Sequence, residues 1–310
     1  MVARLDPTKT KYFPEELPEA ISITAAASTA SGTSVASYAS FSPYVMSLKK
    51  LWSSPITATA TLRLDIDSGH AVIESPLAAR SNLFPSETDM IAQDNLDMWS
   101  VGVSIANAYY TYVMRITKPT IFEKIKHSIT LTDDEKALAD EFDIKRKYLA
   151  GILGARSPNT EQFKKIYEVA RSVTVAAAGS TRVGRIINVK RGEKAVILGI
   201  SVDNTLAPVA NDTYLTINRD VSDTSYVKLD CKAMPPLAYE TPCYIPALDK
   251  HEVLIESVTG VTVAVRYRYG VANLTLMEKI RWGQEGTMTA DEKKTADEFD
   301  LFDSVKAGVL

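Results

Sequence analysis

Hydrophobic and polar residues alternate in the first half of the chain with the period of two that is typical of a half-buried strand. The clearest example is ITATATLRLDI at residues 56–66, which is followed by a turn signal at 67–69 and a returning strand from His70. A run of branched and aromatic residues at 101–116 predicts another strand. The rest of this half is expected to form short strands (21–43), a short helix or a strand (45–52), and a long loop or a short helix (77–98).

The second half shows a similar pattern of short apolar runs separated by turn residues. Strands are expected at 184–189, 195–202, 213–217, 226–229, 251–258 and 261–269. This many short, regularly punctuated strands favours a β-sandwich or a jelly roll. A linker is expected at 154–160 and a helix from there to about residue 171. Residues 179–186 resemble a phosphate loop but lack its lysine and hydroxyl, so they predict a turn between strands.

A repeated block of sequence divides the chain into two halves. TDDEKALADEFDIKRKYLAGIL at 132–153 aligns without a gap with TADEKKTADEFDLFDSVKAGVL at 289–310, and 12 of the 22 positions are identical. Residues 120–126 likewise match 275–281. We therefore expect a mainly β fold with α additions, built from two tandem homologous sandwich or jelly-roll-like modules at residues 1–156 and 157–310. The proline-containing segment 1–20 predicts an extended arm.

Each module is expected to end in a short helix, a loop and a longer amphipathic helix. The longer helices begin with capping boxes, Thr132 with Glu135 and Thr289 with Glu292. Gly151 and Gly308 stand where such helices would end. The apolar side chains of these helices form the candidate assembly interface: Phe142, Leu149, Phe299, Phe302, Val305 and Val309. On this interpretation, serine at Phe299 and Phe302 should weaken assembly more than it unfolds the second module.

Composition and charge exclude several classes of protein. Hydrophobic residues make up 45% and charged residues 24%, which are values of a globular protein. The net charge of -3 gives no reason to expect nucleic acid as the main partner. No apolar window approaches the ~18 residues of a membrane span. The N-terminus has no apolar core behind its basic residues, so no signal peptide is expected and the default site of synthesis is the cytoplasm.

Candidate chemistry is sparse, and no catalytic, cofactor-binding or metal-binding residue is assigned. His70, His127 and His251 are not at metal-ligand spacing. Asp65 and Asp67, two residues apart, form a catalytic or calcium pair in one alternative and an exposed strand end and turn in the other.

Two further groups of side chains leave alternatives open. Cys231 and Cys243 are expected to be separate thiols in a reducing compartment, with a disulfide or metal pair as the alternative. Four strand tyrosines form a candidate binding face for a sugar or a partner: Tyr110, Tyr112, Tyr267 and Tyr269.

These observations favour a structural, self-assembling protein without cofactors. A tandem duplication gives two similar contact surfaces in one polypeptide, which suits a capsid, neck or tail component of a virus or phage particle. The expected partners are further copies of the chain and other structural proteins of the same assembly. One alternative is a carbohydrate- or receptor-binding module that uses the tyrosine face. Another is a hydrolase with Asp65 and Asp67, or His251, in a cleft between the modules.

Overall fold

The computed structural model describes most of the second half of the chain and the strands and helices of the first. The described residues are 16–23, 33–39, 45–54, 61–67, 70–76, 90–101, 108–117, 119–126, 129–144, 163–186, 189–203, 209–220, 227–234, 240–307 and 309–310. The linker at 154–160, Leu149, Gly151, Gly308 and His127 lie outside them.

The described part of each half contains eight strands. In the first half they are β1 (Glu16–Ile23), β2 (Thr33–Ala39), β3 (Val45–Ser54), β4 (Thr61–Ile66), β5 (His70–Pro76), β6 (Met90–Ala92), β7 (Asn95–Val101) and β8 (Ala108–Thr117). In the second they are β9 (Lys165–Val175), β10 (Gly179–Ile186), β11 (Glu193–Val202), β12 (Thr213–Arg219), β13 (Val227–Asp230), β14 (Thr241–Ala247), β15 (His251–Ser257) and β16 (Val261–Asn273).

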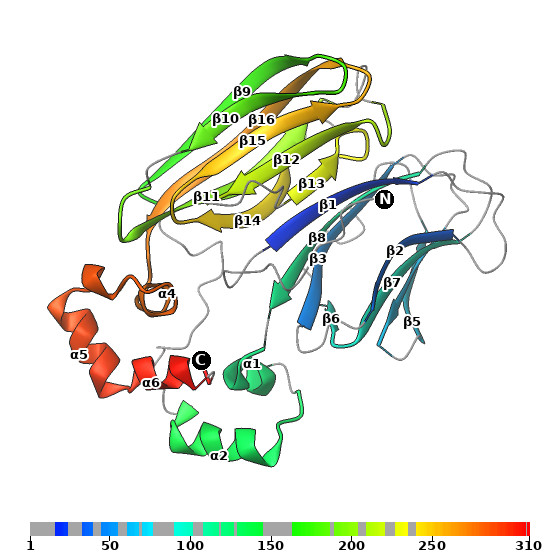
Figure 1. Ribbon diagram of the computed structural model, residues 1–310. Coiled ribbons are helices and arrows are strands. Elements are labelled where there is room, and N and C mark those ends of the chain that lie inside the picture. Colours follow the sequence, from blue (N-terminus) through cyan, green and yellow to red (C-terminus); the bar gives the residue numbers. More distant parts are fainter. Residues whose placement is uncertain are drawn as a thin grey trace.

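The strands form two sandwiches that share one long sheet (Figure 1). That sheet has the order β6-β3-β8-β1-β14-β11-β16-β9, and the two four-stranded sheets are β2-β7-β4-β5 and β10-β15-β12-β13. Each half therefore contributes sheets with the same strand order. Because successive strands repeatedly cross from one sheet to the other, this winding is that of a jelly roll. The expected fold class is confirmed: mainly β, in two sandwich modules with short helices.

The two halves agree in register as well as in strand order. A β-bulge interrupts the pairing of β3 with β8 between Leu48 and Lys50, and a bulge lies at the corresponding point of β11 and β16, between Ile197 and Gly199. The pairs β2·β7 and β10·β15 likewise carry matching bulges. A bulge re-aims the side chains that follow it, so its recurrence at matching points keeps the inward and outward faces equivalent in the two sandwiches.

A buried core fills the second sandwich between its two sheets. It includes Val183 and Ile255 of the four-stranded sheet and Ile197 and Val265 of the long sheet. In β15, every second residue from His251 to Ser257 is buried, as expected for a strand with one face on a core.

Four sequence-based expectations are corrected by the structure. The segment expected to be helical up to residue 171 contains β9, in which Val173 and Val175 alternate with exposed residues. Residues 179–186, expected to be a turn, form β10. The region 77–98 contains β6 and most of β7. The last residues of the expected arm, 16–20, begin β1, and residues 1–15 lie outside the described part.

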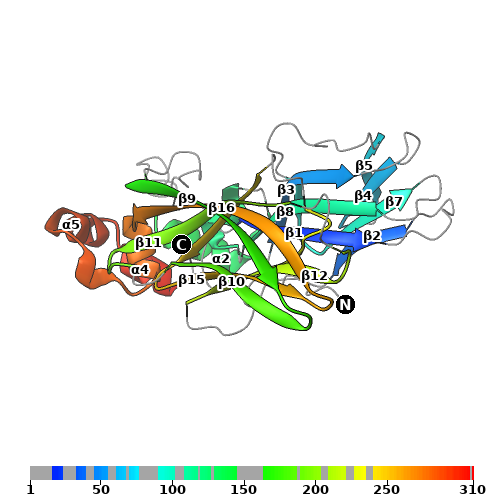
Figure 2. The same cartoon turned by 90° about the horizontal axis from the view of Figure 1, so that it is seen from above.

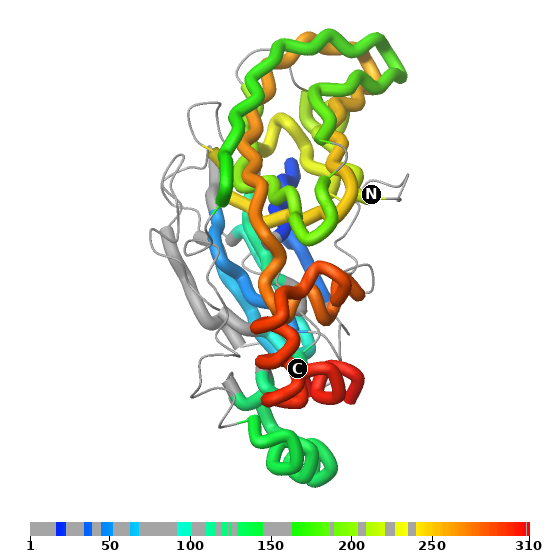
Figure 3. Tube along the Cα trace, turned by 90° about the vertical axis from the view of Figure 1, so that its left-hand side faces the viewer, coloured from blue at the N-terminus to red at the C-terminus, as the bar shows by residue number. Residues whose placement is uncertain are grey.

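The helices gather at one end of the elongated molecule, next to both sandwiches (Figure 3). They are α1 (Ile121–Lys126) and α2 (Asp133–Glu141) in the first half, and α4 (Leu276–Arg281), the 3₁₀ turn η3 (Glu285–Thr287), α5 (Ala290–Glu298) and α6 (Leu301–Lys306) in the second. Both predicted capping boxes are present, and Thr275 with Glu278 forms another at the start of α4.

The expected longer helix of the second half is interrupted. The chain turns after α5 because Asp300 adopts a left-handed conformation with φ of 48°, and α6 starts afresh. Asp143 occupies the same place after α2 with φ of 47°. Aspartate tolerates this conformation better than most residues, so the repeated DEFD sequence is a helix stop.

Candidate assembly interface

Strand β1 joins the two sandwiches. It pairs along its length with β8 of its own sandwich and meets β14 of the other at Glu16 and Tyr244 (Figure 1). Leu17 and Ala20 of β1 belong to the buried core of the second sandwich, with exposed fractions of 3% and 1%. The first sandwich therefore contributes side chains to the core of the second.

A hydrogen bond next to β1 ties the two sandwiches together. Thr111 of β8, 1% exposed, donates from its hydroxyl to the carbonyl oxygen of Ala233 at 2.7 Å. The donor and acceptor are 122 positions apart in the sequence. Because the hydroxyl is buried, losing its partner would leave an unsatisfied polar group, which costs about 1–3 kcal/mol.

The helices of the two halves share a second apolar cluster. Ile121 and Ile144 from the first half lie in it with Ile280, Leu301 and Val309 from the second. The backbone amide of Phe122 also donates to the carbonyl oxygen of Val309 at 3.3 Å. The two halves are therefore held together at β1 and again at this helical cluster. Figure 2, the view from above, shows α4 and α5 at the left, beside the strands.

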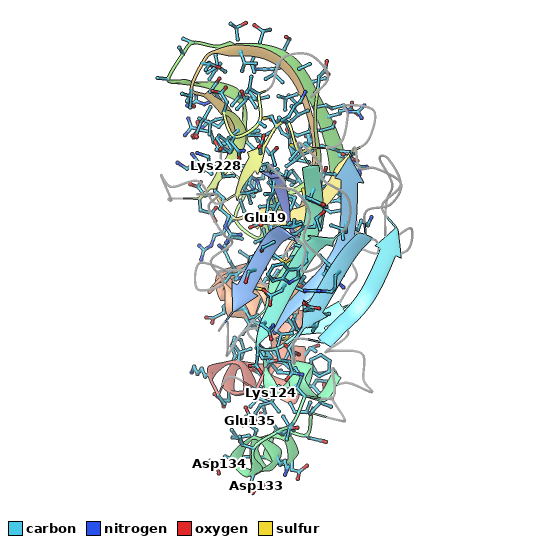
Figure 4. The ribbon with its side chains drawn as sticks, turned by 90° about the vertical axis from the view of Figure 1, so that its right-hand side faces the viewer. Glu19, Lys124, Asp133, Asp134, Glu135 and Lys228 are labelled. Atoms are coloured by element: carbon cyan, nitrogen blue, oxygen red, sulfur yellow. The ribbon has the colours of Figure 1, made fainter. Side chains whose placement is uncertain are left out.

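A lysine–glutamate pair braces the helices in each half. In the first, Lys124 of α1 contacts Glu135 of α2 at 2.6 Å (Figure 4). In the second, Lys279 of α4 contacts both carboxylate oxygens of Glu292 at 2.8 and 2.7 Å. Each glutamate also closes its capping box, and hydrogen bonds from the lysine and the cap hold the pKa of Glu135 below its usual value. The repeated residues thus fix the angle between a short helix and the next one.

A buried lysine anchors α4 on the second sandwich. Lys194 of β11, 1% exposed, donates to Glu278 of α4 at 2.5 Å and to the hydroxyl of Tyr244 at 2.6 Å. Glu278 also accepts from the backbone amide of Thr275 at the helix start. Tyr244 is the residue that pairs with β1. The ammonium group of Lys194 therefore links α4 to the junction of the two sandwiches.

Most of the predicted interface side chains pack against other residues of the same chain. Val309 is fully buried in the helical cluster. Phe142, Phe299, Phe302 and Val305 are partly buried and pack against the same cluster. These side chains make contacts within the chain, and their use between copies remains a prediction.

Three of the four tyrosines of the candidate binding face are buried. Tyr110 and Tyr112 are 0% exposed and Tyr267 is 2% exposed. Tyr269 is partly buried and stacks against Tyr167, with ring centroids 4.8 Å apart. Burial raises the pKa of Tyr267 to about 12. In this structure the four tyrosines do not form an exposed face for a ligand.

A buried polar cluster spans the first sandwich. Glu19 of β1, 4% exposed and labelled in Figure 4, accepts hydrogen bonds from the hydroxyls of Tyr38 of β2 and Tyr112 of β8. The two hydroxyl oxygens are 2.5 Å apart. Burial, together with Glu19, raises the pKa of the Tyr112 hydroxyl well above its ordinary value. This cluster has no signal in the sequence, because its three members are far apart in the chain.

The aspartates of the alternative catalytic pair have separate structural partners. Asp65 forms an ion pair with Arg63 at 3.2 Å. Asp67 has φ of 54° and accepts from the backbone amides of Gln93 and Asp94, both at 2.8 Å. Asp220, at the corresponding place after β12, has φ of 51° and accepts from the amides of residues 248 and 249. Asp67 therefore belongs to a loop-fixing device that occurs in both sandwiches.

His251 and the two cysteines lie in buried surroundings. His251 at the start of β15 is 0% exposed, and burial lowers its pKa to about 3. Cys231 and Cys243 are both buried and are not joined by a disulfide, in agreement with the expectation of separate thiols. Within the described ranges, no group of three or more histidine, cysteine, aspartate or glutamate residues could hold a metal ion. No described helix is long and apolar enough to cross a membrane.

Comparisons with known proteins return distant structural likeness only. No protein-family model and no curated protein matches the sequence. Among solved structures, one titled as the atomic structure of Sulfolobus Turreted Icosahedral Virus is 10% identical with a TM-score of 0.26, and the match covers 84% of this chain and 58% of that chain. Streptomyces albus HEPD with substrate and Fe(II) bound is 8% identical with a TM-score of 0.27, covering 89% and 72%.

A third solved structure, of the infectious bursal disease virus Gx strain, is 8% identical with a TM-score of 0.22 and covers 84% of this chain and 72% of that chain. These neighbours include both virus particles and an enzyme. With TM-scores this low they carry no argument about the function of this chain.

Proposed function

We propose that this chain is a structural, self-assembling protein, a building block of a virus or phage particle that acts by packing against further copies of itself and other structural proteins. The observation that carries this proposal is the repetition of the sandwich in strand order, register and bulges. Two equivalent modules in one rigid chain offer equivalent contact surfaces twice, which suits a lattice or a ring.

The polar residues of the described structure support the same proposal. Asp67 and Asp220 fix loops, and Lys124, Lys279 and Lys194 brace helices. These charged groups are engaged in holding the fold together. A protein whose role is to be a stiff unit needs such internal braces.

The direct test is the molar mass of the purified protein by light scattering over a range of concentrations, with negative-stain imaging of the same samples. The proposal expects rings, tubes or shells whose mass is a multiple of 34.0 kDa. A mass that stays at 34.0 kDa at every concentration would reject assembly of the chain by itself.

A further inference from the structure

The two ends of the long sheet are open in the described structure, and they correspond to the two edges that meet in its middle. The strand order places β6 at one end and β9 at the other, while β1 and β14 are neighbours in the centre. Strand β9 has the same place in the second sandwich as β1 has in the first, and β6 has the place of β14. The junction inside the chain therefore joins two kinds of edge, and one edge of each kind is left over.

Two residues of β1, at the internal junction, are buried, whereas the corresponding residues of β9, at the open end of the sheet, are exposed. Ser22 in β1 corresponds to Ser172 in β9, as does Ala20 to Ala170, at an offset of 150 positions. Ala20 and Ser22 are 1% and 7% exposed, whereas Ala170 and Ser172 are exposed. The second sandwich covers β1, and no described segment covers β9 in the same way.

Strand β9 also has the properties of an edge that can accept another strand. Its 11 residues contain no proline and pair with β16 without a bulge. Ile166, which corresponds to Glu16 at the junction, has 50% of its surface exposed. A long, regular edge strand with an exposed apolar side chain tends to pair with another chain.

We propose that β9 of one copy docks beside β6 of a second copy in the manner in which β1 docks beside β14 within the chain. Copies then join head to tail, and the long sheet continues from one copy into the next. A contact between two different edges leaves one edge of each kind free at every step, so it builds a ring if the rotation closes and a filament if it does not. This inference rests on the proposed self-assembly and specifies the surface that carries it.

The register of the internal junction gives a cross-linking test. Glu16 lies opposite Tyr244. Residues of β9 follow the corresponding residues of β1 by 150 positions, and residues of β14 follow those of β6 by 155 positions, as Ala92 and Ala247 show. Applying both offsets to the pair of Glu16 and Tyr244 gives the register of the new contact. The next antiparallel pair then places Lys165 of β9 opposite Met90 of β6. Within one copy these strands are the first and last of eight, roughly 30 Å apart, which is beyond the reach of a disulfide.

We would oxidise the Lys165→Cys/Met90→Cys double variant and run it on a non-reducing gel. A ladder of dimers, trimers and larger species is expected, with little beyond dimers from either single variant. The wild-type chain, whose two cysteines are buried, is the background control. Efficient dimers from Lys165→Cys alone would indicate a two-fold contact between β9 strands and overturn the proposal, and so would a double variant that assembles without cross-linking.

A second pair of variants separates this inference from the proposed function. Ile166→Lys should raise the concentration needed for assembly by about tenfold or more, because a charge replaces an apolar contact. Val258→Lys, at another exposed apolar residue (63% exposed) outside the two edges, should leave it unchanged. If both variants assemble like wild type, the chain self-assembles by another surface and only the edge contact is rejected. If the wild-type chain itself stays a monomer, the proposed self-assembly and this contact fail together.

Discussion

At the scale of single residues, the ionisable groups in the core decide how stability depends on pH. His251 is fully buried, so its folded-state pKa lies near 3, well below the ordinary value of 6.5. Between these values the unfolded chain binds a proton that the folded chain does not. Stability contributed by the neutral imidazole is therefore complete above about pH 6.5 and is lost as the pH falls toward 3.

We expect the free energy of unfolding of the wild-type chain to fall by up to about 1.4 kcal/mol per pH unit below pH 6.5 on account of His251. His251→Leu removes the titrating group and should show a shallower slope over the same range. Urea unfolding between pH 7 and pH 4.5 measures both. Nearby Asp220 and Arg219 act on the histidine in opposite directions, and they are present in both proteins. Parallel slopes would mean that the imidazole binds its proton equally well in the folded and the unfolded chain.

At the scale of elements, the helical end of the molecule depends on two repeated devices. One is the left-handed aspartate of the DEFD sequence, Asp143 or Asp300. The other is the lysine–glutamate pair that sets a short helix against the next one. The pairs differ in burial, since the lysine side chain is 9% exposed at Lys279 and 22% exposed at Lys124.

Substitutions at Asp300, in the turn between α5 and α6, should change the stability according to whether the new residue tolerates a positive φ. Asp300→Val should lower the free energy of unfolding by about 1–2 kcal/mol, because a β-branched residue is strained at positive φ. Asp300→Gly meets no such strain and is the matched control. Thermal unfolding of both variants checks this. Equal destabilisation by valine and glycine would show that the carboxylate, and not the left-handed backbone, is what the position requires.

Removal of the lysine should cost more in the second half than in the first. We expect Lys279→Met to lower the free energy of unfolding by about 2 kcal/mol, since Lys279 is 9% exposed and donates both to the carboxylate of Glu292 and to the carbonyl oxygen of Thr287. Lys124→Met, which removes the bond to Glu135 of a lysine that is 22% exposed, should cost about 1 kcal/mol or less. Denaturant unfolding measures the difference. The expectation fails if the two variants are equally stable.

The sequence predicted much of this helical end but not its packing. The capping boxes were visible because Thr289 and Glu292 are three residues apart and interact locally. The DEFD sequence was interpreted as part of a continuous helix, because a left-handed aspartate has no periodic signal. Phe299 and Phe302 pack against a cluster whose residues come from both halves of the chain, and local patterns contain no information on such distant contacts.

The strands show the same division between local and distant information. Leu96 and Met98 are buried in β7 and alternate with less buried neighbours, so a period-two count would have found this strand. The first part of β9, up to residue 171, is expected to be helical because Ser157-Pro158 is a helix start signal, and Lys165 and Glu168 in this part are themselves good helix formers. The burial of Tyr110, Tyr112 and Tyr267 has no local signal, because the pattern gives the face of a strand but not whether another sheet covers it.

At the scale of the whole molecule, two junctions join the two sandwiches: the docking of β1 and the helical cluster. The candidate interface residues of α6 belong to the second junction. This placement reverses the expectation for serine at Phe299 and Phe302, because their apolar contacts are made within the chain.

We now expect Phe299→Ser/Phe302→Ser to lower the free energy of unfolding by about 2–4 kcal/mol. The amide of Phe122, which donates to Val309 in the other half, should exchange its hydrogen faster in the variant. Ile125→Ser, at an exposed side chain of α1 (46% exposed), should change neither quantity by much. An unchanged stability combined with lost assembly would instead return these side chains to an interface between copies.

Electron microscopy of the assembled particles is the measurement that decides whether one chain supplies two equivalent modules to an assembly of its own copies. We expect particles in which each copy contributes two lobes of similar size, and in which lobes of neighbouring copies meet as the two lobes of one copy do. Isolated two-lobed monomers at every concentration, or particles whose copies touch only through their helical ends, would contradict it.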